Sequence, residues 1–245
     1  MSGRIALVTG AGGGLGRAAA LELAGRGMPV ACAYGTNDAG AKETAEMIEE
    51  RGGEAQAFGA DVADEQEVRR LFREIKEWRG APLVLVANAG VRRDGPTETY
   101  PLEQWQRTLD VNLTGVFLCV REALRGMQLA RWGRVILVSS AAGLRGNPGQ
   151  ASYSASKAGV LGLTRSLSRE VGARGITVNA VAPGYVETAI VAEMTEAARE
   201  RMMGLIATGR PGRPEEIAAA IGFLAGEEAS YVNGAVLPVD GGMTA

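Results

Sequence analysis

Short apolar runs alternate with amphipathic segments along the whole chain. Seven runs are nearly continuous in Val, Ile, Leu and Ala, as is typical of strands buried on both faces of a parallel sheet. The runs are Ile5–Val8, Val30–Tyr34, Ala55–Phe58, Leu83–Val86, Val135–Val138, Ile176–Val181 and Ala235–Val239. Between them, apolar residues recur with the period of one helix face, as at Val68, Leu71 and Ile75. This alternation predicts an α/β fold, a doubly wound parallel sheet of about seven strands with helices on both faces.

The sequence contains no sign of a second domain. Its 245 residues include no Pro/Ser-rich linker, low-complexity tract or internal repeat, so we expect one domain over residues 1–245. No uncharged apolar stretch approaches the ~18 residues of a membrane span, and the first apolar run is too short for a signal peptide. We therefore expect a cytoplasmic protein that does not bind membranes.

Composition excludes several kinds of site. Lys and Arg number 26, and Asp and Glu number 28, a near-balance that argues against nucleic-acid binding. The chain has no His, which excludes a Ser-His-Asp triad, a histidine general base and histidine metal ligands. Cys32 and Cys119 lie far apart and form no CxxC pair. We therefore expect no metal site, no disulfide framework and a reducing compartment.

A glycine-rich turn links the first predicted strand to a helix. Within Thr9–Gly16, the seven positions from Gly10 to Gly16 contain five glycines, which lets the backbone approach a ligand closely. The N–H groups of the following helix then face a pyrophosphate. This is the Rossmann-type arrangement for binding a dinucleotide. The expected contacts are Gly10, Gly12, Gly13, Gly14, Leu15 and Gly16.

The second predicted strand ends without an acidic residue. An acid at this point holds the ribose hydroxyls of NAD in this fold, whereas here the strand ends at Tyr34 and Gly35, which we expect to border the ribose. Nothing there would repel a 2′-phosphate, so the sequence favours NADP (NADPH). Arg17 is the nearest basic residue, and an ordinary solvated charge on the first helix is an equally good interpretation of it.

Tyr153 and Lys157 are spaced to lie on one face of a helix. A lysine ammonium beside a phenol lowers the tyrosine pKa, so this pair predicts a proton donor or acceptor that works near neutral pH. Ser140 follows a predicted strand at the edge where doubly wound folds bind their ligands. Asn112 lies within a predicted helix, where Asn is unfavourable unless its amide has a task.

These motifs, in this order and at this spacing, resemble the short-chain dehydrogenase/reductase family along essentially the whole chain. The matching residues are Thr9–Gly16, Asp61-Val62, Asn88-Ala89-Gly90, Asn112, Ser140, Tyr153, Lys157, Asn179 and Pro183-Gly184. The resemblance implies that Tyr153 is the acid/base, that Lys157 lowers its pKa and binds the nicotinamide ribose, and that Ser140 positions the substrate carbonyl. It implies that Asn112 holds a water in a proton relay to Lys157. The implied cofactor contacts are Asp61 and Val62 at the adenine, Asn88, Ala89 and Gly90 at the adenosine ribose, and Pro183, Gly184, Val186 and Thr188 at the carboxamide.

Within that family the chain is most similar to the 3-oxoacyl-(acyl-carrier-protein) reductases. The similar stretches are Gly146–Ala151, Arg174–Asn179, Ala182–Thr188 and Val239–Met243. This similarity implies NADPH-dependent reduction of a 3-oxoacyl thioester to the 3-hydroxyacyl thioester, in fatty-acid or polyketide-type chain building. It also implies an acyl carrier protein as partner, docked by Arg131 and Arg174.

Two segments depart from the usual pattern of those reductases. Ala11–Gly14 lacks the hydroxyl and guanidinium that usually lie near the adenosine phosphate, and Val91–Tyr100 replaces an apolar segment near the substrate mouth. The sequence therefore leaves more than one substrate class to be considered. One alternative is an NAD(P)-dependent oxidoreductase of a free sugar, steroid or cyclic alcohol. Another is a dinucleotide-sensing protein without catalysis.

Two predicted helices, Trp105–Leu124 and Tyr153–Val171, carry more apolar residues than one face needs. The residues in question are Val116, Phe117, Val120, Leu124, Val160, Leu161, Leu163 and Leu167. Because they cannot all face the sheet, the surplus predicts an interface between copies of the chain. The family resemblance implies that the assembly is a homotetramer.

Overall fold

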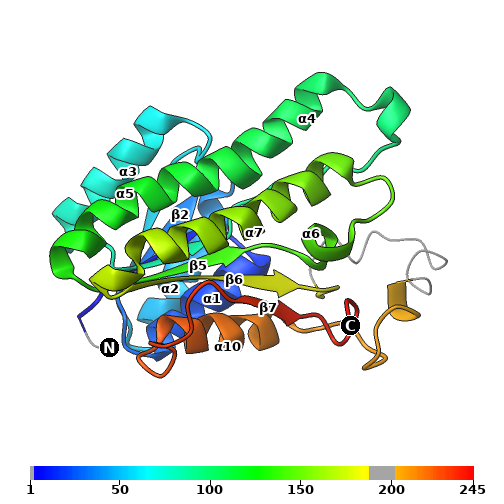
Figure 1. Ribbon diagram of the computed structural model, residues 1–245. Helices are drawn as coiled ribbons and strands as arrows, with labels where there is room; N and C mark the ends of the chain where they lie inside the picture. The colour runs from blue at the N-terminus through cyan, green and yellow to red at the C-terminus, as the bar shows by residue number, and fades with distance from the viewer. Residues whose placement is uncertain (1–2, 188–201) are drawn as a thin grey trace.

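Seven parallel strands form one sheet in a computed structural model that describes residues 3–187 and 202–245 (Figure 1). The strand order is β3-β2-β1-β4-β5-β6-β7, and each neighbouring pair is parallel. The bounds are β1 Ala6–Thr9, β2 Val30–Tyr34, β3 Ala55–Gly59, β4 Val84–Ala87, β5 Gly133–Val138, β6 Ile176–Pro183 and β7 Val236–Val239. The predicted doubly wound sheet of seven strands is confirmed, and the strand bounds differ from the apolar runs by two residues at most.

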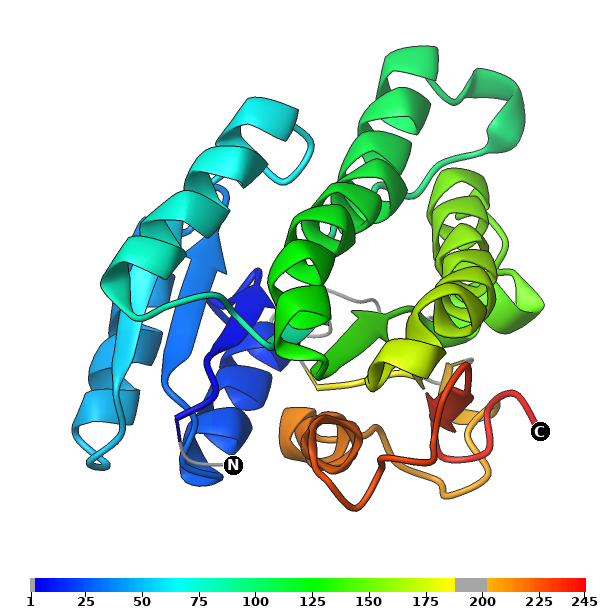
Figure 2. The same ribbon diagram turned by 60° about the vertical axis from the view of Figure 1, so that its left-hand side comes forward.

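Helices cover both faces of the sheet, as Figure 2 shows. One layer holds α1 (Gly14–Gly25), α2 (Asp38–Glu49) and α10 (Pro214–Ala225). The other holds α3 (Glu65–Trp78), α5 (Gly115–Ala130) and α7 (Ala151–Val171). Shorter elements lie at the ends of the sheet: η1 Thr97–Thr99, α4 Leu102–Leu109, α6 Ala141–Arg145 and η3 Gly172–Arg174.

Alternate residues of each strand pack into different cores. In β1, Leu7 joins the core beneath α3, α5 and α7, whereas Val8 joins the core beneath α1, α2 and α10. Both side chains are fully buried. This explains why the strands are continuously apolar rather than alternating, because each face of the sheet has its own helical layer. Because all seven strands are parallel, their carboxyl ends lie at the same edge of the sheet.

A π-helical turn, η2 (Asp110–Thr114), joins α4 to α5. The sequence predicts an uninterrupted helix over Trp105–Leu124, and the difference is this one widened turn. Such turns are rare and are frequent at functional sites. Here the turn holds Asn112, whose side chain is completely buried.

The predicted apolar surplus on two helices is smaller than expected. Five of the eight residues, Val116, Val120, Leu124, Val160 and Leu161, are buried within the chain's own core, because α5 and α7 also pack against each other and α5 packs against α3. Phe117 stays 42% exposed. It borders a groove of about 410 Å³ between α5 and α7, together with Leu113, Gly159, Gly162 and Leu163.

Candidate active site

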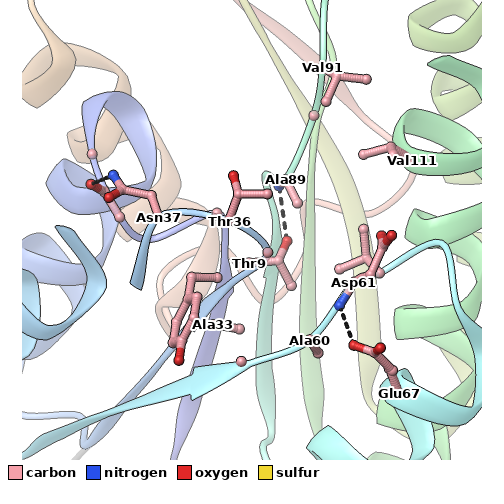
Figure 3. Close-up of a pocket in the computed structure, with 18 of the residues that line it drawn as sticks. Thr9, Ala33, Thr36, Asn37, Ala60, Asp61, Glu67, Ala89, Val91 and Val111 are labelled. Carbon is pink, nitrogen blue, oxygen red and sulfur yellow. Dashed lines mark hydrogen bonds between the residues drawn. The ribbon is translucent and has the colours of Figure 1, made fainter. Parts of the chain in front are cut away.

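Two adjoining cavities lie along the carboxyl edge of the sheet. The first, of about 670 Å³, extends over the ends of β1, β2 and β3 (Figure 3). The second, of about 460 Å³, extends over the ends of β4, β5 and β6. Five residues line both, namely Gly10, Gly13, Ala89, Gly90 and Val91. The two cavities therefore form one trough across the point where the strand order reverses, which is where doubly wound folds bind nucleotides.

The glycine-rich turn fits tightly under this trough. A Cβ atom at position 16 would lie 2.0 Å from the carbonyl oxygen of Gly10, and Gly10 itself has φ +70°. Gly13 is different, because a Cβ there would have no protein atom within 4 Å. Gly13 thus presents bare backbone to the cavity just before α1 begins at Gly14. A dinucleotide pyrophosphate fits this cradle at the helix N-terminus.

Asn88 braces the turn from the end of β4. Its Nδ2 donates to the carbonyl oxygens of Thr9 and Gly10, at 3.0 and 3.3 Å. The Thr9 hydroxyl oxygen in turn accepts from the backbone N–H groups of Asn88 and Ala89, both at 3.0 Å. The Asn88 side chain therefore shapes the loop, and Ala89 and Gly90 line both cavities.

Arg17 is not at the cofactor site. Its guanidinium lies against α2, where it donates to Thr44 at 3.1 Å and forms an ion pair with Glu43. Arg70 of α3 instead lines the cavity beside Tyr34 and Gly35, at the end where the adenosine is expected. Its Nη2 donates to the Gly59 carbonyl at 3.0 Å. No motif in the sequence marks Arg70, because its approach to β2 depends on the packing of α3 beside β3.

Asp61 and Val62 line the same cavity. The Asp61 carboxylate pairs with Arg107 of α4 at 2.8 Å, and the Asp61 backbone N–H donates to the Glu67 carboxylate at 2.8 Å (Figure 3). Sequence reasoning missed Arg107 and Glu67, which no local pattern distinguishes from other helix charges. Both hold the end of β3 in position at the expected adenine site.

Ser140, Tyr153 and Lys157 meet in the second cavity. Ser140 lies two residues after the end of β5, and its Oγ accepts from the backbone N–H of Ala142 at 3.1 Å, which caps α6. Tyr153 and Lys157 are one turn apart on α7. Lys157 is buried, and its Nζ donates to the Val138 carbonyl at 2.8 Å. This arrangement places two hydroxyls and one amine at the carboxyl end of β5.

Asn112 lies behind this cluster and lines neither cavity. Its Oδ1 accepts from the Val91 N–H at 2.8 Å, and its Nδ2 donates to the Val91 carbonyl at 2.9 Å. A Cβ at Gly90 would lie 3.3 Å from Asn112 Oδ1 and 3.6 Å from Lys157 Nζ. The amide of Asn112 thus fixes the backbone beside Lys157, and the relay through a water stays a prediction.

Burial moves the pKa values of both groups on α7. It raises the pKa of Tyr153 above its ordinary value, although a hydrogen bond with Ser140 and the charge of Arg92 act to lower that pKa. Burial also lowers the pKa of Lys157 to about 8. The Tyr153 pKa therefore lies above its ordinary value in this structure, and its lowering by Lys157 stays a prediction. The Lys157 Nζ lies 5.7 Å from the Tyr153 ring centre, and desolvation dominates both groups.

The far wall of the second cavity comes from the end of β6. Pro183, Gly184 and Val186 line it, and Gly184 packs so closely on Asp240 that a Cβ would lie 2.7 Å from the Asp240 Cα. Thr188, the remaining predicted contact, lies outside the described residues. All the other predicted cofactor contacts line one cavity or both.

A third, smaller cavity of about 130 Å³ opens beside the Ser140 and Tyr153 hydroxyls. It shares Arg92, Ser140, Tyr153, Gly184 and Tyr185 with the second cavity. Arg145 and Gln150 also line it. A substrate carbonyl that reaches Ser140 and Tyr153 would therefore bring the adjacent part of the substrate next to Arg92.

The family described as enoyl-(acyl carrier protein) reductase matches residues 10–244. The chain belongs to the short-chain dehydrogenase/reductase family. A 3-oxoacyl-(acyl-carrier-protein) reductase of Pseudomonas aeruginosa is 44% identical over 99% of this chain and 98% of its own length. One from Synechocystis has the same identity and coverage. The crystal structure of a putative gluconate dehydrogenase from Agrobacterium tumefaciens is 32% identical and superposes with a TM-score of 0.96, covering 100% of this chain and 97% of that one.

In this short-chain dehydrogenase/reductase, Arg131 and Arg174 lie at the edge of the sheet opposite the trough. Arg131 ends α5 with a φ of +50° just before β5, and Arg174 ends η3 just before β6. The two loops adjoin, since a Cβ at Gly175 would lie 2.5 Å from the Arg131 carbonyl oxygen. The two arginines therefore belong to one surface that does not reach its own chain's trough.

Family membership implies a nicotinamide cofactor. Within the described part of the chain, no cluster of three or more His, Cys, Asp or Glu side chains could hold a metal ion. Nor is any helix in the described ranges long and apolar enough to cross a membrane. Cys32 and Cys119 are both free and buried, and burial raises the pKa of each thiol to about 12.

Proposed function

We propose that this chain reduces the C3 ketone of a 3-oxoacyl thioester, carried by an acyl carrier protein, to the 3-hydroxyacyl thioester with NADPH. The observation that carries the proposal is the grouping of Ser140, Tyr153 and Lys157 at the end of a trough shaped for a dinucleotide. The relatives that are 44% identical over nearly the whole chain support the substrate class. Fatty-acid or polyketide-type chain building is the process in which such a reaction takes part.

Each part of the trough has its own task in this reaction. The glycine-rich turn and the N-terminus of α1 hold the pyrophosphate, and Pro183, Gly184 and Val186 face the carboxamide. Bound NADPH supplies the hydride that goes to C3. The Ser140 hydroxyl donates to the C3 oxygen and orients it, and the Tyr153 hydroxyl gives that oxygen its proton. Lys157 then returns a proton to the Tyr153 phenolate. Asn112 fixes the Val91 backbone beside Lys157.

The preference for NADPH over NADH rests on the end of β2. Tyr34, Gly35, Thr36 and Asn37 line the cavity there and bring no carboxylate, while Arg70 brings a guanidinium. We expect kcat/KM to favour NADPH by at least about tenfold. Arg70→Ala should remove most of this preference without changing kcat/KM for NADH. Equal use of both cofactors by the unmodified protein would contradict the assignment.

The reaction also needs a surface for the carrier protein. We assign that role to the adjoining loops of Arg131 and Arg174, because the loops make one basic patch and acyl carrier proteins are acidic. The patch lies on the opposite edge from its own trough, so it can serve a neighbouring subunit in a homotetramer. The apolar groove beside Phe117 supports such an assembly, and the cytoplasm remains the expected compartment.

A free small hydroxy acid or sugar is the second candidate substrate, favoured by the similarity to a putative gluconate dehydrogenase. The deciding experiment measures NADPH oxidation with 3-oxoacyl thioesters on carrier protein and on small thiols, and NADP reduction with gluconate and cyclic alcohols. Turnover of the thioesters with kcat/KM at least about a hundredfold above that for the free alcohols would support the reductase. The reverse order would establish the second candidate.

A further inference from the structure

Arg92 lies where the second and third cavities adjoin. It follows the Asn88-Ala89-Gly90 turn by two positions and lines both the second cavity and the small substrate-side cavity. Ser140 and Tyr153 line the same two cavities. The guanidinium therefore borders the space in which the reacting carbonyl group must lie.

The loop that carries Arg92 is fixed to the start of the catalytic helix. Arg92 Nε lies 3.2 Å from Oδ1 of Asp94, and Oδ2 of Asp94 accepts from the buried Gln150 amide at 3.0 Å. The Gly95 N–H donates to the Gly149 carbonyl at 2.8 Å. These contacts tie the loop to the residues just before α7, the helix that bears the reacting phenol.

A second tie lies farther along the loop. The Ser152 hydroxyl donates to the Tyr100 hydroxyl at 3.1 Å, and Tyr100 in turn donates to the Arg93 carbonyl at 2.9 Å. These ties fix residues that follow Arg92, and the two hydrogen bonds between Val91 and Asn112 fix the residue before it. Because the backbone that carries Arg92 is fixed, less freedom is lost when the residue binds a ligand, which favours specific recognition.

The hydrogen-bonding capacity of Arg92 is only partly used. Its Nε contacts Asp94, while its two terminal nitrogens have no partner among the described residues. Those nitrogens can donate to an oxygen in the cavity, and a planar guanidinium is well suited to this task. A 3-oxoacyl thioester supplies such an oxygen, because its C1 carbonyl lies two carbons from the C3 ketone.

We propose that Arg92 binds the C1 thioester carbonyl oxygen of the substrate and thereby selects 1,3-dicarbonyl compounds over simple ketones. This inference rests on the proposed function. When the C3 oxygen lies at Ser140 and Tyr153, the C1 oxygen is the next hydrogen-bond acceptor along the acyl chain. Arg92 is the arginine that lines both cavities together with Ser140 and Tyr153. Of the nearby arginines, Arg145 lines only the third, smaller cavity, and Arg93 lines neither the second cavity nor the third.

The charge of Arg92 has a second effect, on the proton donor. It lowers the Tyr153 pKa, while Asp94 raises it. Ser140, Lys157 and Tyr185 also line the second cavity beside the phenol, and Arg145 and Gln150 line the third cavity with it. Removing Arg92 should accordingly move the kinetic pKa assigned to Tyr153 upward with every substrate, so this effect is separate from recognition of C1.

The test uses two matched substrates that differ only at C1. One is the N-acetylcysteamine thioester of 3-oxobutanoate. The other is the corresponding thioether ketone, in which a methylene replaces the C1 carbonyl. For Arg92→Gln we expect kcat/KM for the thioester to fall at least about tenfold, mainly through KM, because a hydrogen bond from a charged donor is lost. At a pH below the Tyr153 pKa, kcat/KM for the thioether ketone should stay within about twofold.

Arg93→Gln is the matched control, since it removes the same charge from the adjacent residue, which lines neither cavity, and it should leave both substrates unchanged. Arg92→Lys keeps the charge without the fork and should give an intermediate loss with the thioester. Equal losses for both substrates in Arg92→Gln, or no loss with either, would overturn the inference. Failure of the unmodified protein to reduce the thioester would instead refute the proposed function, so the two failures can be told apart.

Discussion

The glycine-rich turn allows a sharp test of how the cofactor cradle is built. In Gly16→Ala the new Cβ would lie 2.0 Å from the Gly10 carbonyl oxygen and 2.7 Å from its carbon. Both atoms are backbone, so the loop must shift. Overpacking of this kind lowers the free energy of unfolding by about 1–3 kcal/mol. Because the contact at Gly16 is so short, we expect a cost at or above the upper end of this range. The better helix propensity of Ala recovers about 1 kcal/mol. We expect a net loss of about 2 kcal/mol.

A loss of this size lowers the Tm by about 4–8 °C in a chain of this length. Thermal unfolding without cofactor measures it, and cofactor fluorescence measures the Kd for NADPH. Gly13→Ala should behave differently, because its Cβ has open space around it and its backbone is extended. It should keep the Tm within about 1 °C while raising the Kd at least tenfold, since the methyl group occupies the position of the pyrophosphate.

Gly25→Ala serves as the stability control. It lies exposed in the same helix with no protein atom near the added Cβ, so it should raise the Tm slightly and leave the Kd unchanged. A Gly16→Ala variant with unchanged Tm would refute the packing argument. A Gly13→Ala variant that binds NADPH normally would show that the pyrophosphate lies elsewhere.

Four further predictions concern the catalytic cluster and the surfaces. Tyr153→Phe should lower kcat by about 10²–10⁴ and leave the NADPH Kd within twofold, and a variant that keeps a tenth of kcat would contradict the acid/base role. Burial lowers the Lys157 pKa from 10.5 to about 8, so the unfolded chain binds more protons than the folded chain between these two pH values. The burial of Lys157 therefore lowers the free energy of unfolding fully below pH 8, and this cost disappears as the pH rises to 10.5. Lys157→Met should therefore unfold at higher denaturant at pH 7, by about 2 kcal/mol after loss of one hydrogen bond, and the advantage should be gone at pH 10.5. Arg131→Glu and Arg174→Glu should each raise KM for carrier-bound substrate roughly tenfold, with a salt-sensitive on-rate, and leave a small thioester within about twofold. Phe117→Glu should reduce the mass measured by light scattering from that of a tetramer, because a charge enters the apolar groove.

The surface variants have matched controls. Leu129→Glu adds the same charge to a residue of α5 that is 89% exposed and does not line the groove, so it should not change the mass. An unmodified protein of monomer mass at micromolar concentration would refute the tetramer. If charge reversal at the two arginines lowers activity on the small thioester as well, their role is structural.

The sheet and the phosphate turn could be predicted from the sequence because their signals are local. A continuous apolar run such as Ile176–Val181, bounded by turn residues, is typical of a strand covered on both faces. Thr9–Gly16 lies between a strand and a helix, as a phosphate loop requires. The spacing of Tyr153 and Lys157 also holds in the structure, since both lie on α7. These features depend only on residues close together in the chain.

The features that the sequence did not show depend on packing between distant segments. Arg70 reaches the cofactor cavity through the placement of α3 beside β3, and the widened turn that holds Asn112 has no local pattern that marks it. A low Tyr153 pKa is the natural expectation from the sequence, because the neighbouring charge is visible there and the burial is not. Five apolar residues of α5 and α7 look like an interface in the sequence, because the contact between these helices cannot be foreseen from it.

The ties between the 91–100 loop and the start of α7 make the two segments a single exchangeable unit. A chimera that receives a loop without an acid at position 94, but keeps its own helix start, would leave the buried Gln150 amide without this partner, a mismatch of about 1–3 kcal/mol. Such a chimera would also release Arg92 from its position beside the Ser140 and Tyr153 hydroxyls. Transplanting the loop together with residues 149–152 avoids both losses. Divergence of substrate preference along this lineage should accordingly show paired changes in two stretches of sequence some fifty residues apart, 91–100 and 149–152.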